Sequence, residues 1–298
     1  MDTSERLDTL FREAVAAIDA GDASTLERLL IAHPRLTQDR LDAPGDWLRN
    51  QVGNALEGFF QKPYLLWFVA EDPVRNGKLP ENIAQVTHVI IEAAQRAGVE
   101  SLQEQLDYAL RLVSWSWIAR ECEVQIALLD VLVDAGASPE GNPNNALVNG
   151  NFAAAEHLVE RGAPLTLATA LCLERWEDVD RLAQTANARQ KQFGFILAAL
   201  NGKSAAVVRM LALGVDLNAP SEDLYAHAIA LHHAVCSGSL DTVKVLVEAG
   251  ADLKAKDTAY QGTPLGWAEH YQDQQKRDVK GKQYTAIVAY LREKESQP

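Results

Sequence analysis

The sequence predicts an all-α protein built from repeated helix-turn-helix units, and three observations support this. Pairs of glycines recur twelve residues apart, and the residues between them carry apolar side chains at helical spacing. Copies of this pattern follow one another along much of the chain, as is typical of repeat proteins. Glycine, serine, threonine and proline stand where such helices would begin and end.

The first copy is expected near the start of the chain, over residues 8–36. Its turn falls at Gly21, and its second helix begins near Leu26. The sequence around Pro34 replaces the glycine that ends the later copies. This stretch therefore predicts one helical pair with an altered ending.

The next segment, 37–120, does not show the repeat pattern but still predicts helices. Long periodic runs cover 82–98 and 101–120, with Gly98 as a stop signal and Ser101 as a start signal. We interpret this segment as divergent helical pairs of the same array. A separate N-terminal helical domain is the alternative.

The regular copies occupy residues 124–271. Their predicted inter-helix turns are separated by 26, 24, 28 and 36 residues and fall at Val124, Gly150, Glu174, Gly202 and Gly238. Units of 24–28 residues can hold two helices with little chain to spare.

The last two copies are the most regular. Thr263 is expected to cap a helix whose first turn accepts Pro264, because the N–H that proline lacks has no partner there. Gly238 suits the tight turn between paired helices, where left-handed backbone angles are cheap for glycine. Gly250 is expected to end the second helix of its pair.

These stretches resemble the ankyrin repeat, a helix-turn-helix unit of roughly 33 residues that opens with Thr-Pro-Leu-His-x-Ala. The resemblance implies one ankyrin-like α-solenoid of stacked repeats over residues 1–298. In this interpretation 1–123 holds divergent repeats, 124–271 recognisable repeats, and 272–298 a C-terminal loop and capping helix. The shortened units predict few or short β-hairpin fingers between repeats.

The resemblance also implies that the chain binds another protein through the concave face of the solenoid. The residue between the motif histidine and alanine varies between repeats and would face that groove; it is His233 in one copy and Trp267 in the next. Two tyrosines and two aspartates lie in the longest inter-repeat loops. The predicted contact set is His233, Trp267, Tyr225, Tyr260, Asp223 and Asp257. The alternative for Trp267 is packing against the capping helix, residues 284–293.

Motifs for catalysis and for cofactors do not stand out. Residues 201–204 resemble the end of a phosphate-binding loop, but Leu197 stands where that loop needs glycine. We expect neither an enzyme nor a bound cofactor. A metal-dependent enzyme or sensor is the less favoured alternative, with His232, His233, Cys236 and His270 as its ligands.

Three cysteines, an odd number spread far apart, do not form a disulfide framework and suit a reducing cytoplasm. Cys122, Cys172 and Cys236 align at one position of the repeat, where another copy has Leu200. This alignment predicts buried, inert thiols.

The net charge of −13 argues against nucleic acid and anionic membranes as partners. No run of apolar residues is long enough to span a membrane, and the N-terminus lacks a secretory pattern. We therefore expect a cytoplasmic monomer with an unidentified protein partner. The alternative is a small-ligand receptor whose pocket lies within 45–120, where Trp47, Trp67, Trp115 and Trp117 concentrate.

Overall fold

A computed structural model describes residues 3–274 and 282–297, and helices account for nearly all of its regular structure. Strand pairing in the described residues is limited to an isolated antiparallel bridge between Ser221 and Leu224. The chain divides into two compact units, residues 1–164 and 165–298. The predictions of an all-α fold and of few β-hairpin fingers are confirmed.

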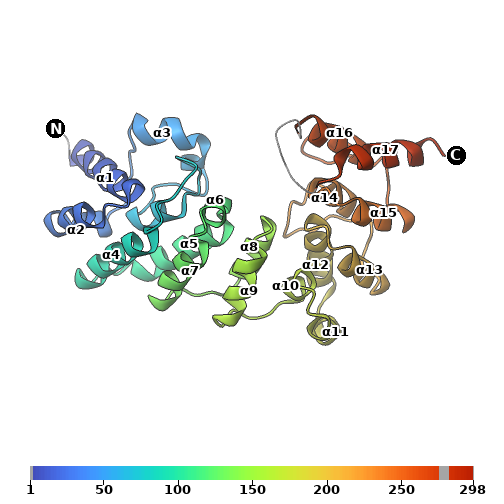
Figure 1. Cartoon of the computed structure of the whole chain (residues 1–298), viewed down its shortest axis with the longest axis horizontal. Helices are drawn as coiled ribbons and strands as arrows, with labels where there is room; N and C mark the ends of the chain where they lie inside the picture. Colours follow the sequence, from blue (N-terminus) through green and yellow to red (C-terminus); the bar gives the residue numbers. More distant parts are fainter. Residues whose placement is uncertain (1–2, 275–281, 298) are drawn as a thin grey trace. The chain divides into compact units, whose positions relative to one another are not determined.

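The first unit consists of two rows of packed elements (Figure 1). One row contains the second helices of successive pairs: α2 (Ala23–Ala32), α4 (Ile83–Arg96), α7 (Gln125–Asp134) and α9 (Phe152–Glu160). The other row contains α1 (Thr3–Ala20), η3 (Leu65–Ala70), α5 (Leu102–Trp115) and α8 (Asn142–Val148). Shorter elements connect the rows: η1 (Pro34–Thr37), α3 (Asp46–Val52), η2 (Gly53–Glu57) and α6 (Trp117–Glu121).

The 3-10 helix η3 takes the place that a first helix would have in the second pair. It contacts α1 on one side and α5 on the other, and all six of its residues are buried. Its last turn leads into Glu71, which has a left-handed φ of 51°. The divergent segment 37–120 therefore contributes helical pairs to the first unit, but one of its first helices is reduced to a short 3-10 turn.

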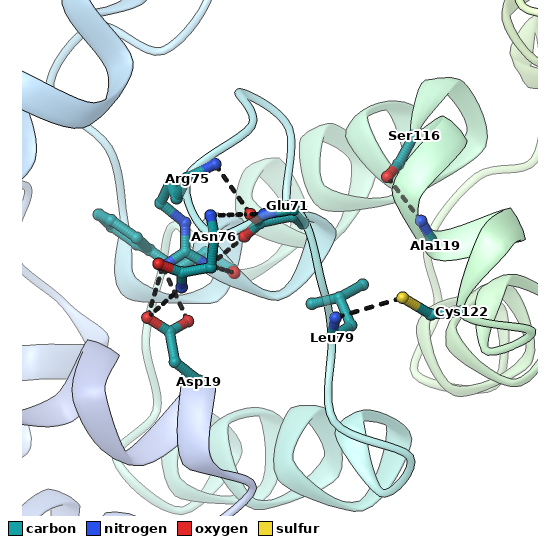
Figure 2. A network of polar contacts seen from close by, with 10 residues as sticks. Asp19, Glu71, Arg75, Asn76, Leu79, Ser116, Ala119 and Cys122 are labelled. Atoms are coloured by element: carbon teal, nitrogen blue, oxygen red, sulfur yellow. Dashed lines mark hydrogen bonds and ion pairs between the residues drawn. The ribbon is translucent and has the colours of Figure 1, made fainter. Parts of the chain in front are cut away.

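A buried ionic network fixes the loop that follows η3 (Figure 2). Arg75 lies 3.0 Å from a carboxylate oxygen of Glu71 and 2.8 Å from Asp19 on α1. Arg75 also donates to the carbonyl of Phe68 at 2.7 Å. Glu71 accepts the backbone N–H groups of Arg75 and Asn76. Buried charges of this kind are tolerated only when paired and hydrogen-bonded, as they are here.

The second unit contains the more regular pairs (Figure 1). Its first helices pack in order and are α10 (Leu167–Cys172), α12 (Ala188–Leu200), α14 (Ala230–Ser237) and α16 (Pro264–Gln274). Their partners are α11 (Trp176–Thr185), α13 (Ser204–Ala212), α15 (Leu240–Glu248) and α17 (Tyr284–Glu295). Gly194 permits the close approach of α12 to α10, because a Cβ there would lie 2.9 Å from a methyl group of Leu171.

Residues with left-handed backbone angles mark the turns within the pairs. Among the residues with positive φ, those at turns between the two helices of a pair are Gly21, Glu123, Gly150, Glu174, Gly202 and Gly238. The predicted turn at Val124 is therefore wrong by one residue, since Glu123 has the positive φ and Val124 precedes α7 as its N-cap.

Two further predictions are refined at the helix ends. Thr263 accepts the N–H of Gly266 at 3.1 Å, and α16 begins at Pro264, as expected. The helix predicted over 101–120 is broken at Ser116, whose side chain caps α6 by accepting the N–H of Ala119.

The C-terminal helix α17 packs on α15 and α16. Residues 275–281 of the predicted loop lie outside the described residues, and the single solenoid over 1–298 stays a prediction.

Candidate functional site

A buried carboxylate organises the loop between α15 and α16. Asp257 is 1% exposed and accepts backbone N–H groups from Ala259 at 2.9 Å, Tyr260 at 2.6 Å and Gly262 at 2.8 Å. Its second oxygen also accepts the indole N–H of Trp267 at 3.0 Å. Burial alone would raise the pKa of this carboxyl group, but the four donors outweigh burial and hold the pKa below its ordinary value.

Trp267 is half-buried at the centre of an aromatic cluster. Its ring centroid lies 5.1 Å from that of His232, 6.0 Å from His227 and 6.4 Å from His233. The ring of Tyr271, one turn further along α16, lies 6.4 Å away. These contacts and the bond to Asp257 hold the indole in one orientation, on the side of α16 that faces α14.

His233 is not a surface residue, and its predicted exposure is wrong. The side chain is 2% exposed, because the ring of Tyr225 stacks over it at 5.9 Å and Trp267 packs against its edge. Burial, and then the neighbouring imidazoles of His232 and His227, lower the pKa of His233 to about 4. The imidazole is therefore neutral at physiological pH and packs beneath the rings of Tyr225 and Trp267.

Equivalent positions in earlier repeats are buried as well. Thr169 on α10 and Leu197 on α12 have no exposed surface. The close packing of α10, α12 and α14 covers this position of the repeat. Of the side chains assigned to the variable position, only that of Trp267 is partly accessible.

The two loop tyrosines do lie at the surface. Tyr260 is 79% exposed and Tyr225 is 43% exposed. Both rings contact His227, at 6.1 Å each, so this histidine joins the two loops. The carbonyl of His227 also accepts the backbone N–H of Thr258 at 2.8 Å.

An open groove runs beside these rings, with a volume of about 550 Å³. We call it the Tyr260 groove. It is lined by Tyr260, Gly262, Gly266, Trp267, His270 and Tyr271. Gly262 permits its shape, because a Cβ at this position would lie 2.8 Å from the indole of Trp267. A single side chain of a partner is small enough to enter the space between the exposed Tyr260 and the half-buried rings of α16.

Asp223 lies apart from this groove and has a different role. Its carboxylate pairs with Arg189 on α12, accepting the Nε–H at 2.7 Å. This hydrogen bond lowers the pKa of Asp223. The structure thus brings together five of the six predicted residues: Tyr225, His233, Asp257, Tyr260 and Trp267.

Sequence reasoning missed His227, Gly262 and Tyr271 at this site. His227 occupies the same loop as Tyr225, which was the available signal. The alternative role of Trp267, packing against the capping helix, has only indirect support. The ring that stacks on Tyr284 of that helix, at 5.3 Å, belongs to Tyr271.

The cysteines do not share one environment. Cys172 is fully buried, and burial raises the pKa of its thiol to about 12. Cys122 and Cys236 are half-buried, so their prediction as buried thiols is wrong. The alignment of Cys122 is also wrong, because the turn falls at Glu123 and the equivalent position is Glu121. Cys236 lies in reach of α16, where the hydroxyl of Tyr271 donates to its sulfur at 3.2 Å.

Neither a metal site nor a membrane-spanning helix is found in residues 3–274 and 282–297. No group of three or more His, Cys, Asp or Glu side chains in these ranges could hold a metal ion. None of the helices described there is long and apolar enough to cross a membrane.

The tryptophans of the first unit divide into two kinds. Trp47 stacks on Phe68 and donates to Asp8 at 2.8 Å, and Trp67 is buried against Tyr108. Trp67 belongs to the core, and Trp47 is half-buried beside it. Trp115 and Trp117 instead line an open pocket of about 280 Å³. The alternative of a small-ligand receptor with its pocket within 45–120 stays a prediction.

Comparison with known proteins agrees with the repeat pattern. The family model described as ankyrin repeats (3 copies) matches residues 143–257 and 195–276. The chain therefore contains ankyrin repeats over residues 143–276. The matched range contains the Tyr260 groove and the helices α9 to α16, most of which belong to the second unit. Ankyrin repeats are generally modules for protein–protein interaction.

Two solved ankyrin-repeat structures are similar to this chain. The crystal structure of the human ASB11 ankyrin repeat domain has 18% sequence identity and a TM-score of 0.35, with 72% of this chain and 96% of that chain covered. The ankyrin repeat domain of Bcl-3 has 20% identity and a TM-score of 0.31, with 75% and 97% covered. No curated protein matches the sequence.

Proposed function

We propose that this ankyrin-repeat protein binds a partner protein through the Tyr260 groove and has no catalytic role. The observation that carries the proposal is the exposure of Tyr260 beside a groove whose other walls are held in place. A ring that is 79% exposed at a fixed position contributes little to the fold. Exposed aromatic rings next to a groove are common anchors of protein interfaces.

The fixed position of this loop is important for affinity. Asp257 binds three backbone N–H groups of the loop and the indole of Trp267, so the loop is ordered before a partner arrives. Less conformational entropy is then lost on binding, because the protein side of the interface is already organised. The face formed by Tyr225, Tyr260 and Trp267 would supply the aromatic contacts.

The chemistry of the groove favours an apolar or aromatic side chain of the partner. The described residues that line it are rings and glycines without a carboxylate, and the nearby Asp257 is buried and already hydrogen-bonded. Binding on the concave face of one solenoid remains part of the proposal.

The test is affinity capture from the native cell with wild-type protein and with Tyr260→Ala. Within the described part of the chain the ring of Tyr260 contacts one other ring, that of His227, so the loss of Tyr260 should leave folding unchanged while weakening capture. Removal of a hot-spot aromatic weakens binding by about 2 kcal/mol, or roughly thirtyfold. Ile31→Ala on α2 is the matched control, since Ile31 is a large exposed apolar residue in the other unit. Equal recovery of the same partner by both variants would show that the interface lies elsewhere.

A further inference from the structure

A second site lies in the first unit, at the pocket that contains Trp115 and Trp117. We call it the Asp72 pocket. It has a volume of about 280 Å³ and is lined by Phe59, Glu71, Asp72, Val74, Trp115, Ser116, Trp117 and Asn149. These residues come from the loops around η2 and η3, the junction of α5 with α6, and the end of α8. The site is thus built from four parts of the chain and does not depend on the Tyr260 groove.

Large apolar side chains remain exposed around this pocket. Phe59 is 44% exposed, Val74 is 43% exposed and Trp117 is 42% exposed. The ring of Phe59 lies 6.5 Å from that of Trp115. Apolar surface of this kind that gathers at one hollow marks an interaction site more often than scattered exposed residues do.

The two carboxylates of the pocket are in different states. Glu71 forms an ion pair with Arg75, whose guanidinium also binds Asp19 (Figure 2). Asp72 has no hydrogen bond or ion pair to any residue in the described ranges. Burial, and then the negative charge of Glu71, raise the pKa of Asp72 to about 6. At neutral pH the pocket therefore contains a half-buried anion without a counter-ion.

An organic cation fits these walls better than a metal ion. Calcium requires six to eight oxygen ligands, and the described residues offer no cluster of three or more metal-binding side chains. Aromatic rings attract ammonium and guanidinium groups through their negative faces. A carboxylate supplies the opposing charge, and its attraction is strengthened because the site is partly withdrawn from water.

The size of the pocket limits the ligand to one such group. Pockets for drug-sized molecules occupy about 300–1,000 Å³, and this pocket lies just below that range. A single ammonium or guanidinium headgroup with its adjoining methylenes fills a smaller space. We propose that the Asp72 pocket binds one organic ammonium or guanidinium group, with Asp72 as the counter-ion and Trp115, Trp117 and Phe59 as the walls.

This cation could belong to a partner's side chain or to a free small molecule. The full chain is titrated with N-acetyl-arginine amide, N-acetyl-lysine amide and choline, and binding is followed by calorimetry and by tryptophan fluorescence. N-acetyl-citrulline amide is the uncharged match for the arginine probe. A preference for the arginine or lysine amide would indicate a partner's side chain, and a preference for choline a free cation.

The proposal predicts saturable binding of at least one cationic probe at concentrations up to about 10 mM, which corresponds to a weak single-group contact. The citrulline derivative should bind about tenfold more weakly, because it lacks the charge that pairs with Asp72. Asp72→Asn should weaken cation binding by about tenfold, and Trp117→Ala by about fivefold through the lost cation–π contact.

Asp42→Asn is the matched control, since it removes an exposed carboxylate of the same unit that pairs with Lys62. Its affinity for the probes should stay within about twofold of the wild-type value, as for an exposed ion pair outside the site. No saturable binding of any cationic probe by the wild-type protein would overturn the proposal. So would equal affinities of the wild-type protein and folded Asp72→Asn.

Discussion

The buried carboxylate of Asp257 offers a sharp test of how the Tyr260 groove is held in place. Asparagine at this position has nearly the same shape but no charge. Its amide oxygen can accept two of the four N–H groups that Asp257 now accepts, whereas its NH₂ group would face the other two donors. Hydrogen bonds to a charged group contribute about 1.5–3 kcal/mol each. Because the loop can relax toward water, we expect Asp257→Asn to lower the free energy of unfolding by about 2–4 kcal/mol at neutral pH.

The same reasoning predicts how the contribution of Asp257 to the free energy of unfolding depends on pH. The folded-state pKa of Asp257 lies below the ordinary value of 3.8, so its contribution is fully present above pH 3.8 and is lost as the pH falls through the folded-state pKa. The stability difference between wild-type protein and Asp257→Asn should therefore be constant at neutral pH and shrink below pH 3.8.

The assay is urea unfolding followed by circular dichroism across this pH range. Asp252→Asn serves as the control, because Asp252 is exposed and accepts one backbone N–H, from Lys254. A result in which Asp257→Asn is as stable as Asp252→Asn at neutral pH would refute the reasoning. A stability difference that widens in acid would refute it as well.

Three other predictions concern single residues. Burial raises the pKa of Asp72 from 3.8 to about 6, so ionisation of Asp72 destabilises the fold as the pH rises through this range. Asp72→Asn should therefore add about 2–3 kcal/mol to the free energy of unfolding at neutral pH and nothing below pH 3.8. A loss of stability of this variant in urea unfolding would contradict the prediction. A thiol reagent should label Cys122 and Cys236 well before Cys172, because Cys172 is buried and its pKa is raised to about 12. Mass spectrometry measures the labelling rate of each cysteine, and equal rates would show that the three thiols share one environment. Gly262→Ala places a Cβ 2.8 Å from the neighbouring indole and should lower stability by about 1–3 kcal/mol, whereas an unchanged melting temperature would mean that the loop does not need this close approach.

The repeat architecture could be predicted from sequence because its turns have a strict backbone requirement. Gly150, Gly202 and Gly238 stand where the chain adopts left-handed angles, which glycine accepts without strain. Glu123 has the same conformation with a side chain present, and so the predicted turn falls one residue too late. The 3-10 helix η3 could not be foreseen, because six consecutive buried residues show no helical period.

The candidate site could be predicted in part. The exposure of Tyr225 and Tyr260 follows from their place in long loops, which usually run over the surface. The burial of His233 depends on a ring from another part of the chain, Tyr225, whose position only the folded loop determines. Asp257 was predicted as a surface contact because its hydrogen-bond donors belong to its own loop conformation, which the sequence pattern does not encode.

The structure also changes which residue should be substituted to test binding at the groove. Trp267 is the residue that repeat alignment singles out, yet its indole is tied to Asp257 and packed against three histidines. Trp267→Ala should therefore lower stability as well as binding. Tyr260, which contacts only His227 among the rings of the described chain, reports on binding with little effect on the fold.

Hydrogen exchange with a captured partner tests the binding proposal most directly. Amide exchange over residues 257–271 is compared with and without the partner protein, with α4 as an internal reference in the other unit. If the Tyr260 groove is the interface, backbone amides of 257–271 should exchange more slowly in the complex, while those of α4 should exchange at the same rate. Unchanged exchange over 257–271, together with protection at another surface, would contradict the proposal.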